Sequence, residues 1–349
     1  MARRDLTGDT DEPADPEPLP PGQGTRAAPG GRLLIHGYVF VDWVTQGYIA
    51  LAGLLVVVLH GSSVPRWELL VAIHAAALVV VHLLIRSARL RPQCRVLDFL
   101  RSFYPVFLYL GFYSEIGMID HMLFSGFLDP FFIRLDQRIF GVQPSLFLMV
   151  ALPYRPLSEL LYASYFSYYV MIAGVGLALY LRDRHEFFHF LSVMTFTFCC
   201  CYLLFDLFPV MGPRIFYEQV PGYSLPVALR PASVPAVPEA VAGGPFFLLM
   251  GWIYRTFETG GAAFPSAHVA IALVTLWFSF RYLRPIRWLH LALVVLLCFS
   301  TVYCRYHYAV DVAGGILVAA LLVPLGSRLS ANWPAPGEGR KPRRVRASP

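Results

Sequence analysis

Long apolar runs separated by short polar segments make up most of the chain between residues 39 and 327. Most runs approach the roughly 20 residues that an α-helix needs to cross the hydrocarbon core of a bilayer. None shows the strict alternation of a half-buried strand. We therefore expect an all-α, polytopic membrane helix bundle with about eight transmembrane helices. The predicted spans are 39–60, 67–86, 99–118, 158–181, 187–209, 265–283, 286–304 and 307–327.

The composition supports a membrane protein. Hydrophobic residues make up 57% of the chain and charged residues only 14%, whereas about a quarter of the residues in a soluble domain are charged. The formal net charge of +6 does not indicate a nucleic-acid partner, because the basic residues fall in short segments between spans. There they are typical of topology signals.

Arginine residues precede the first predicted span, fill the second, fourth and sixth connections, and recur in the C-terminal tail. The positive-inside rule predicts that these segments, and hence both termini, are cytoplasmic. The longer connections 119–157 and 210–264 would then face the outside or a lumen. The arginines of the three connections are Arg86, Arg89, Arg91, Arg95, Arg182, Arg184, Arg281, Arg284 and Arg287.

Composition also divides the chain along its length. Residues 1–38 are mostly polar, with many Pro, Gly, Asp and Glu, and are expected to form a disordered cytoplasmic tail. Residues 39–97 hold two additional transmembrane helices, 98–327 a six-helix core, and 328–349 a basic cytoplasmic tail. Within the core, residues 244–258 are apolar and aromatic but too short to span, which predicts an interfacial segment.

The first polar cluster is Pro265-Ser266-Ala267-His268, at the outer start of the sixth predicted span. Proline suits the first helical position, and free N–H groups with the helix dipole favour an anion there. Ser266 can add a hydroxyl donor, and His268 can give a proton to an oxygen of that anion. The alternative is that Ser266 only caps the helix and His268 is an interfacial histidine.

The second cluster lies between the seventh and eighth spans and includes Arg305, His307 and Asp311. On a helix, His307 and Asp311 at i, i+4 share a face, and a carboxylate on one ring nitrogen raises the basicity of the other. That pattern suits an imidazole that attacks phosphorus, with Arg305 as a charge for phosphate oxygens. The alternative, a buried pair without a ligand, is costly at a membrane interface.

Both clusters fall at outer ends of predicted spans, so they predict one composite site. Arg214, in a turn fixed by Pro and Gly after the fifth span, can clamp phosphate or anchor to lipid headgroups. Four tyrosines in the fourth span indicate an aromatic belt or a headgroup pocket. They are Tyr162, Tyr165, Tyr168 and Tyr169.

The Pro265–His268 segment followed by His307-x-x-x-Asp311 resembles the type 2 phosphatidic acid phosphatase superfamily. Its motifs read KxxxxxxRP, PSGH and SRxxxxxHxxxD, and the resemblance covers about residues 98–327. Ala267 replaces the motif glycine, and Thr301 stands at the motif arginine. Arg305, four residues later on the same expected helical face, could substitute for that arginine.

The first motif is barely present, since Leu207 stands at its lysine and Pro213-Arg214 reverses its last two letters. These departures resemble the inositol phosphorylceramide synthase (inositolphosphotransferase) branch. The segment Leu135-Asp136-Gln137-Arg138-Ile139-Phe140-Gly141-Val142-Gln143-Pro144 is also similar to that branch.

The resemblance implies that His307 is the nucleophile, Asp311 orients it, and His268 protonates the leaving alkoxide. It implies that Arg214, Ser266 and Arg305 hold the phosphoryl oxygens, with no metal and no other cofactor required. The implied substrate is a phospholipid or lipid phosphate, in the plasma membrane or a Golgi-type endomembrane. Release by water makes a phosphatase, and release by a lipid alcohol makes a headgroup transferase of sphingolipid type.

Two other functions remain open from the sequence. A lipid transporter or scramblase could bind a headgroup without cleaving it, although such proteins often show inverted repeats. A metal site built from His268, His307 and Asp311 lacks the short, fixed ligand spacings typical of such sites.

Overall fold

The computed structural model describes residues 37–219, 237–257, 261–331, 333 and 336, all within the compact unit Leu33–Pro349. The described residues are all-α, as predicted, apart from an isolated bridge between Val210 and Ala262. The helices are α1 (Phe40–Leu59), α2 (Trp67–Leu90), α3 (Arg95–Ile119), α4 (Asp129–Phe140), α5 (Pro144–Ala151), α6 (Arg155–Arg182), α7 (Arg184–Leu207), α8 (Pro213–Gln219), α9 (Pro245–Phe257), α10 (Ala267–Tyr282), the 3-10 turn η3 (Arg284–Ile286), α11 (Arg287–Tyr303) and α12 (Ala309–Ser330).

Six segments in the described part of the chain are long and apolar enough to cross a membrane: α1, α2, α6, α7, η3 with α11, and α12. The prediction of eight spans is therefore wrong by this criterion. Helix α10 has 16 residues, about 24 Å at 1.5 Å per residue, which is short of a core about 30 Å thick. Helix α3 is long enough, but its three tyrosines, Pro105 and Glu115 dilute its apolar residues.

Helix α7 lies at the centre of the bundle and packs against α1, α3, α6, α10 and α12. It starts where Asp183 caps it, accepting hydrogen bonds from the backbone N–H groups of His185 and Glu186 at 2.8 and 3.1 Å. Such caps satisfy amide groups that have no partner inside the helix. Because α7 also contacts α1, the two additional N-terminal helices pack on the rest of the bundle and do not stand apart from it.

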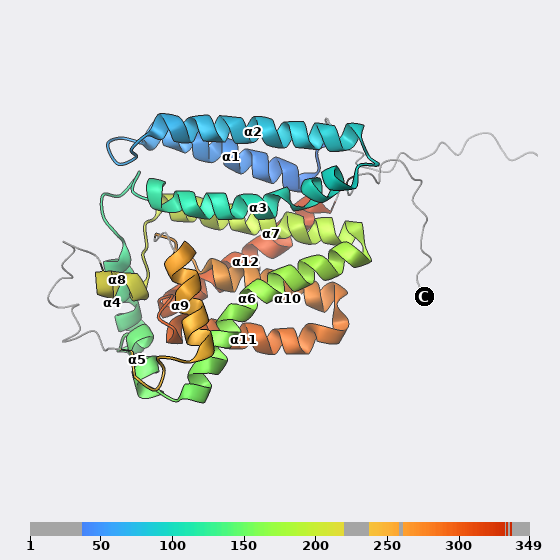
Figure 1. Ribbon diagram of the computed structural model, residues 1–349. Coiled ribbons are helices and arrows are strands. Elements are labelled where there is room, and N and C mark those ends of the chain that lie inside the picture. The colour runs from blue at the N-terminus through green and yellow to red at the C-terminus, as the bar shows by residue number, and fades with distance from the viewer. Residues whose placement is uncertain (1–36, 220–236, 258–260, 332, 334–335, 337–349) are drawn as a thin grey trace, which may run out of the picture. The chain divides into compact units, whose positions relative to one another are not determined.

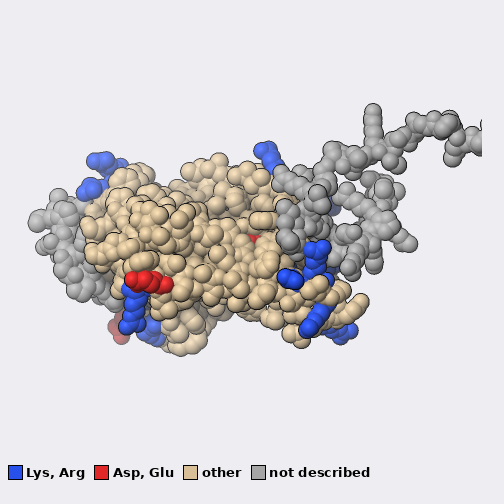
Figure 2. Space-filling view, turned by 90° about the horizontal axis from the view of Figure 1, so that it is seen from above, with Lys and Arg blue, Asp and Glu red and all other residues tan. Residues whose placement is uncertain are grey.

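Helix α2 exposes large apolar side chains. Ile73, Val79, Val80 and Leu83 are each more than half exposed, which is unfavourable in water but suits contact with lipid. Figure 2 views this face and shows Lys and Arg side chains gathered towards its two ends, with a largely uncharged surface between them. This distribution fits the multi-pass integral membrane protein that the apolar helices indicate.

The Arg-rich connections and the short helices lie at opposite ends of the bundle (Figure 1). The α2–α3, α6–α7 and α10–α11 connections lie to the right, whereas α4, α5, α8 and α9 lie towards the left. The start of α10 and the turn before α12 lie at the same end as the short helices. The two predicted polar clusters are thus brought to one end of the bundle.

Two predicted segments need separate mention. The predicted tails 1–38 and 328–349 lie mostly outside the described residues, although α12 continues to Ser330. Residues 245–257 of the predicted interfacial segment 244–258 form the 13-residue helix α9. Its first backbone N–H groups donate to the carboxylate of Glu159 in α6.

Candidate functional site

The first cluster forms the start of α10, but the helix begins two residues later than expected, at Ala267. Ser266 is the N-cap, and its hydroxyl oxygen accepts a hydrogen bond from the backbone N–H of Val269 at 3.3 Å. Pro265 therefore precedes the cap and is not the first helical residue. Ser266 therefore caps the helix, as in the alternative considered from the sequence, and its hydroxyl proton stays able to donate. Its backbone N–H donates to the carbonyl oxygen of Asp311 at 3.1 Å, which joins α10 to α12.

The second cluster lies in a tight turn and not on a helix. Helix α11 ends at Tyr303, and the carbonyl oxygen of Thr301 accepts hydrogen bonds from the backbone N–H groups of Tyr306 and His307, both at 3.0 Å. Arg305 has a φ of 62°, in the left-handed region that side chains other than glycine seldom adopt. The expectation that Arg305 shares a helical face with Thr301 is therefore wrong, because the helix ends before it.

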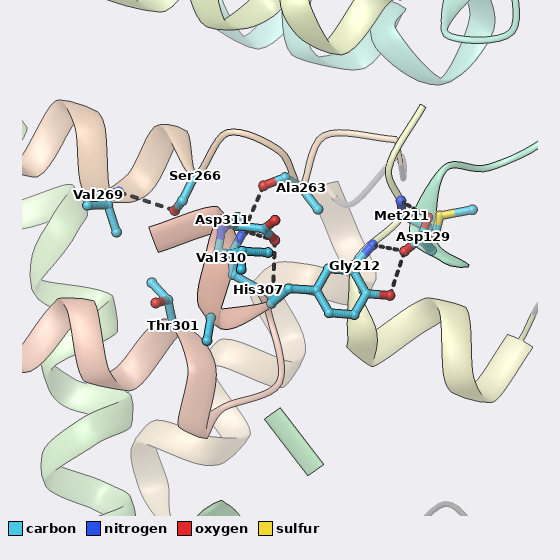
Figure 3. A network of polar contacts seen from close by, with 12 residues as sticks. Asp129, Met211, Gly212, Ala263, Ser266, Val269, Thr301, His307, Val310 and Asp311 are labelled. Carbon is cyan, nitrogen blue, oxygen red and sulfur yellow. Dashed lines mark hydrogen bonds and ion pairs between the residues drawn. The ribbon is translucent and has the colours of Figure 1, made fainter. Parts of the chain in front are cut away.

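His307 also precedes α12, so the expected i, i+4 pairing on a helix is wrong in its detail. The pair nevertheless forms: Nδ1 of His307 lies 3.4 Å from Oδ2 of Asp311. The same Nδ1 lies closer, at 2.9 Å, to the carbonyl oxygen of Ala263 (Figure 3). A carbonyl oxygen can only accept, so Nδ1 carries the proton and the lone pair is on Nε2.

The two histidines lie side by side. The ring centroids of His268 and His307 are 5.7 Å apart, with the rings inclined at 62°. The structure therefore brings the two predicted clusters together, and the catalytic roles of their residues stay a prediction. Tyr165 and Tyr168 pack on His268 with centroid distances of 4.9 and 4.5 Å, and both are buried. These two tyrosines line the histidine pair and do not form a lipid-facing belt, while Tyr169 is 38% exposed.

His307 lies between the membrane-spanning segments that end at Tyr303 and start at Ala309. Burial lowers the pKa of His307 to about 4, and the hydrogen bond with Ala263 opposes part of this shift. The imidazole is therefore neutral near pH 7, with its Nε2 lone pair available. A neutral imidazole with a fixed tautomer can act as a nucleophile or a base.

Arg214, in α8, lies beside the His307 turn. Its guanidinium carbon is 4.7 Å from the ring centroid of Tyr254 and 5.5 Å from that of Tyr306. Those two rings stack on each other at 4.1 Å. Cation–π contact of this kind orients a guanidinium. Arg305 is buried, with 3% of its surface exposed, two residues before His307.

The sequence interpretation missed two buried carboxylates of α4. Asp129 accepts hydrogen bonds from the backbone N–H groups of Met211 (2.8 Å) and Gly212 (2.9 Å) and from the hydroxyl of Tyr308 (2.8 Å). Burial raises the pKa of Asp129 to about 6, and these three hydrogen bonds oppose the shift. Figure 3 shows Asp129 with Met211 and Gly212 on one side of the network, and His307 on the other.

Asp136 lies two helical turns further along α4 and is fully buried. Its carboxylate oxygens accept from the backbone N–H groups of Ala309 at 2.9 Å and Val310 at 3.1 Å. The available sequence signal was the Leu135–Pro144 segment, which contains Asp136. The sequence of that segment does not indicate which amide groups bind Asp136, because the partner residues lie more than 170 positions away.

The described residues contain no group of three or more His, Cys, Asp or Glu side chains arranged to hold a metal ion. The alternative metal site at His268, His307 and Asp311 therefore gains no support from the arrangement of these side chains. His307 presents Nδ1 to Ala263, and Asp311 uses Oδ2 to accept from the backbone N–H of Tyr308 at 2.8 Å.

Comparison with protein families gives a match to the PAP2 superfamily over residues 131–325, from α4 into α12. Comparison with curated proteins and with solved structures found no match. The matched region contains both histidines, Asp311 and the arginines of the site. Since it covers more than half of the 349-residue chain, the chain belongs to the PAP2 superfamily and is a membrane protein of a family of phosphatase-type phosphoryl-transfer enzymes.

Proposed function

We propose that this protein is a lipid phosphotransferase or lipid phosphate phosphatase that works through a phosphohistidine on His307. The observation that carries the proposal is the histidine pair: ring centroids 5.7 Å apart, with Nδ1 of His307 held by the carbonyl oxygen of Ala263. One histidine thereby presents Nε2 as a nucleophile, and the other is close enough to exchange a proton with the reacting group.

In the first half-reaction, Nε2 of His307 attacks phosphorus of a phospholipid or lipid phosphate. The bond from phosphorus to the leaving oxygen breaks, and His268 donates a proton to that oxygen. In the second half-reaction, an acceptor hydroxyl gives its proton to His268 and attacks phosphorus. The N–P bond then breaks, and His307 is released with its lone pair restored.

Charge on the phosphoryl oxygens is assigned to Arg214, Arg305 and the hydroxyl of Ser266. The position of Arg214 supports this role, because its guanidinium group packs on the ring of Tyr306, the residue before His307. The start of α10 adds the positive end of a helix dipole. Preorganised donors of this kind stabilise the transition state for phosphoryl transfer. Asp311, buried beside Nδ1 of His307, stabilises the positive ring.

The arginine distribution supports a site on the outer or lumenal side. The Arg-rich connections lie at the end of the bundle opposite to the site (Figure 1), and such connections face the cytoplasm. Water as acceptor gives a phosphatase, and a lipid alcohol gives a transferase. The resemblance to the inositolphosphotransferase branch favours transfer of an inositol phosphate-type headgroup to a sphingolipid, in the plasma membrane or a Golgi-type endomembrane.

The test compares His307→Ala and His268→Ala on a radiolabelled lipid phosphate and on an activated nitrophenyl ester. His307→Ala should lose turnover and phosphoenzyme on both substrates. His268→Ala should lose the lipid reaction but still form phosphoenzyme from the ester, because nitrophenolate leaves without a proton. His185→Ala, an exposed histidine at the start of α7, is the matched control and should behave as wild type.

Chasing the labelled enzyme with water or with a lipid alcohol identifies the acceptor. If the activated ester rescues His307→Ala but not His268→Ala, the two histidine roles are reversed. If both variants keep wild-type rates on both substrates, the site is not catalytic. A transporter or scramblase that binds a headgroup would then explain it.

A further inference from the structure

We propose that α4 is a brace for the reaction. Asp129 and Asp136 are positioning residues that fix the turn containing His307 against the segment Met211–Gly212, which leads into α8 and Arg214. The inference rests on the proposed function, because it assigns a role relative to His307 as nucleophile. The two carboxylates are seven residues apart on α4, so they project from the same side of that helix two turns apart.

Asp136 fixes the segment directly after His307. It accepts from the backbone N–H groups of Ala309 and Val310, while Asp311 accepts from that of Tyr308. Three consecutive amide groups at the start of α12 are therefore occupied by carboxylates. A helix N-terminus commonly offers such groups to a phosphate. Here they anchor the backbone that carries His307, and substrate phosphate has to be held elsewhere.

Asp129 joins two segments that are about 95 residues apart in sequence. Its Oδ1 accepts from both the backbone N–H of Gly212 and the hydroxyl of Tyr308, and its Oδ2 accepts from the N–H of Met211. Gly212 is two residues before Arg214, and Tyr308 follows His307. One buried carboxylate thus links the phosphate-holding arginine to the nucleophile.

The same two segments meet closely at the backbone. Gly212 has a φ of 90°, and a Cβ there would lie 2.9 Å from the carbonyl oxygen of Tyr306. The N–H of Ala263 donates to the carbonyl oxygen of Val210 at 2.9 Å. Ala263, whose carbonyl oxygen binds Nδ1 of His307, is therefore joined to the same segment. A small shift of α4 would therefore move the arginine, the nucleophile and its hydrogen-bond acceptor together.

Tyr308→Phe is the sharpest test, because it removes one hydroxyl and leaves the ring. Tyr104→Phe is its matched control, since the Tyr104 hydroxyl donates to buried Asp42 at 2.7 Å, away from the site. Asp136→Asn is the second variant, in which the amide NH₂ would face a backbone N–H. Asp98→Asn is its control, because Asp98 binds Arg184 at 2.7 Å near the other end of the bundle.

We expect Tyr308→Phe and Asp136→Asn each to slow phosphoenzyme formation and kcat by about 10-fold or more, since small displacements of reacting groups have large effects on rate. KM should change little. The two control variants should lose comparable thermal stability in detergent but keep the wild-type kcat. If one site variant fails to fold, the other carries the test, because the two remove different hydrogen bonds of the same brace.

The outcomes separate the two proposals. If the wild-type enzyme forms no phosphoenzyme and His307→Ala keeps its turnover, the proposed function is overturned, and the brace with it. A trapped phosphohistidine whose rate of formation is unchanged in both site variants overturns the brace alone. An equal fall of kcat in Tyr104→Phe would also overturn it, because general loss of packing would then explain the effect.

Discussion

The carbonyl oxygen of Ala263 lies 2.9 Å from Nδ1 of His307, nearer than the carboxylate of Asp311 at 3.4 Å. The backbone therefore sets the tautomer of His307. In the proposed mechanism, Asp311 then acts mainly through its negative charge. Positive charge develops on the ring only as phosphorus becomes bonded to Nε2. A loss of the Asp311 charge should then affect the transition state more than substrate binding.

Asp311→Asn should accordingly lower kcat by about 10²-fold, less than the roughly 10⁴-fold loss expected where a carboxylate alone fixes the tautomer. KM should stay close to the wild-type value. Steady-state kinetics on the lipid substrate, with Asp98→Asn as control, measures both. A collapse as large as that of His307→Ala would mean that Asp311 and not Ala263 sets the tautomer.

The pH dependence should report the depressed pKa of His307. Its folded pKa is about 4, below the ordinary value of about 6.5, so the neutral nucleophile persists as the pH falls through the usual histidine range. In the His268→Ala background, with a nitrophenyl phosphodiester that does not titrate in this range, kcat/KM should stay level until the pH approaches about 4. It should then fall with unit slope. A fall near the ordinary histidine pKa would contradict the buried environment of His307.

The sequence predicted that the two histidine clusters lie together, because their placement depends on local spacing and on topology. The predicted spans beginning at 265 and 307 placed His268 and His307 at one end of the bundle, and their ring centroids lie 5.7 Å apart. Local spacing was less reliable where a helix ended early. The i, i+4 expectation for His307 and Asp311 assumed a continuous helix, whereas α12 begins only at Ala309.

Other features could not be predicted because they depend on contacts between distant segments. The hydrogen bonds from Ala309 and Val310 to Asp136 join residues more than 170 positions apart. Nothing in the local pattern around Asp136 distinguishes such a brace from an exposed acidic residue on an amphipathic helix. The count of eight spans failed for a different reason: apolar character alone does not say whether a segment such as α10 is long enough to cross.

Chelation of divalent ions should leave activity intact. Charge on the phosphoryl oxygens is assigned to Arg214, Arg305 and the hydroxyl of Ser266, and guanidinium groups keep their charge at any pH used in the assay. Turnover of the lipid substrate with and without excess EDTA measures this. Loss of activity in EDTA, restored by one divalent ion, would favour the alternative of a metal site at His268, His307 and Asp311.

Substitution of Gly315 should move apart α10, which carries His268, and α12, which follows the His307 turn. A Cβ at Gly315, in α12, would lie 2.5 Å from the carbonyl oxygen of Ser266 and 3.0 Å from Cβ of Val269. The carbonyl belongs to the first turn of α10 and accepts from the N–H of Ala270, so it cannot move without disturbing the cap. Gly315→Ala should therefore destabilise the protein by about 1–3 kcal/mol through overpacking.

Gly174→Ala is the matched control, because a Cβ at Gly174, in α6, meets nothing within 4 Å. It should stabilise its helix by about 0.5–1 kcal/mol, since alanine loses less backbone entropy than glycine. Unfolding midpoints in detergent should move in opposite directions for the two variants. Phosphoenzyme formation should fall only in Gly315→Ala, because widening the gap between α12 and the start of α10 moves His307 away from His268. If both variants were equally stable, the close contact between Gly315 of α12 and the carbonyl oxygen of Ser266 would be contradicted.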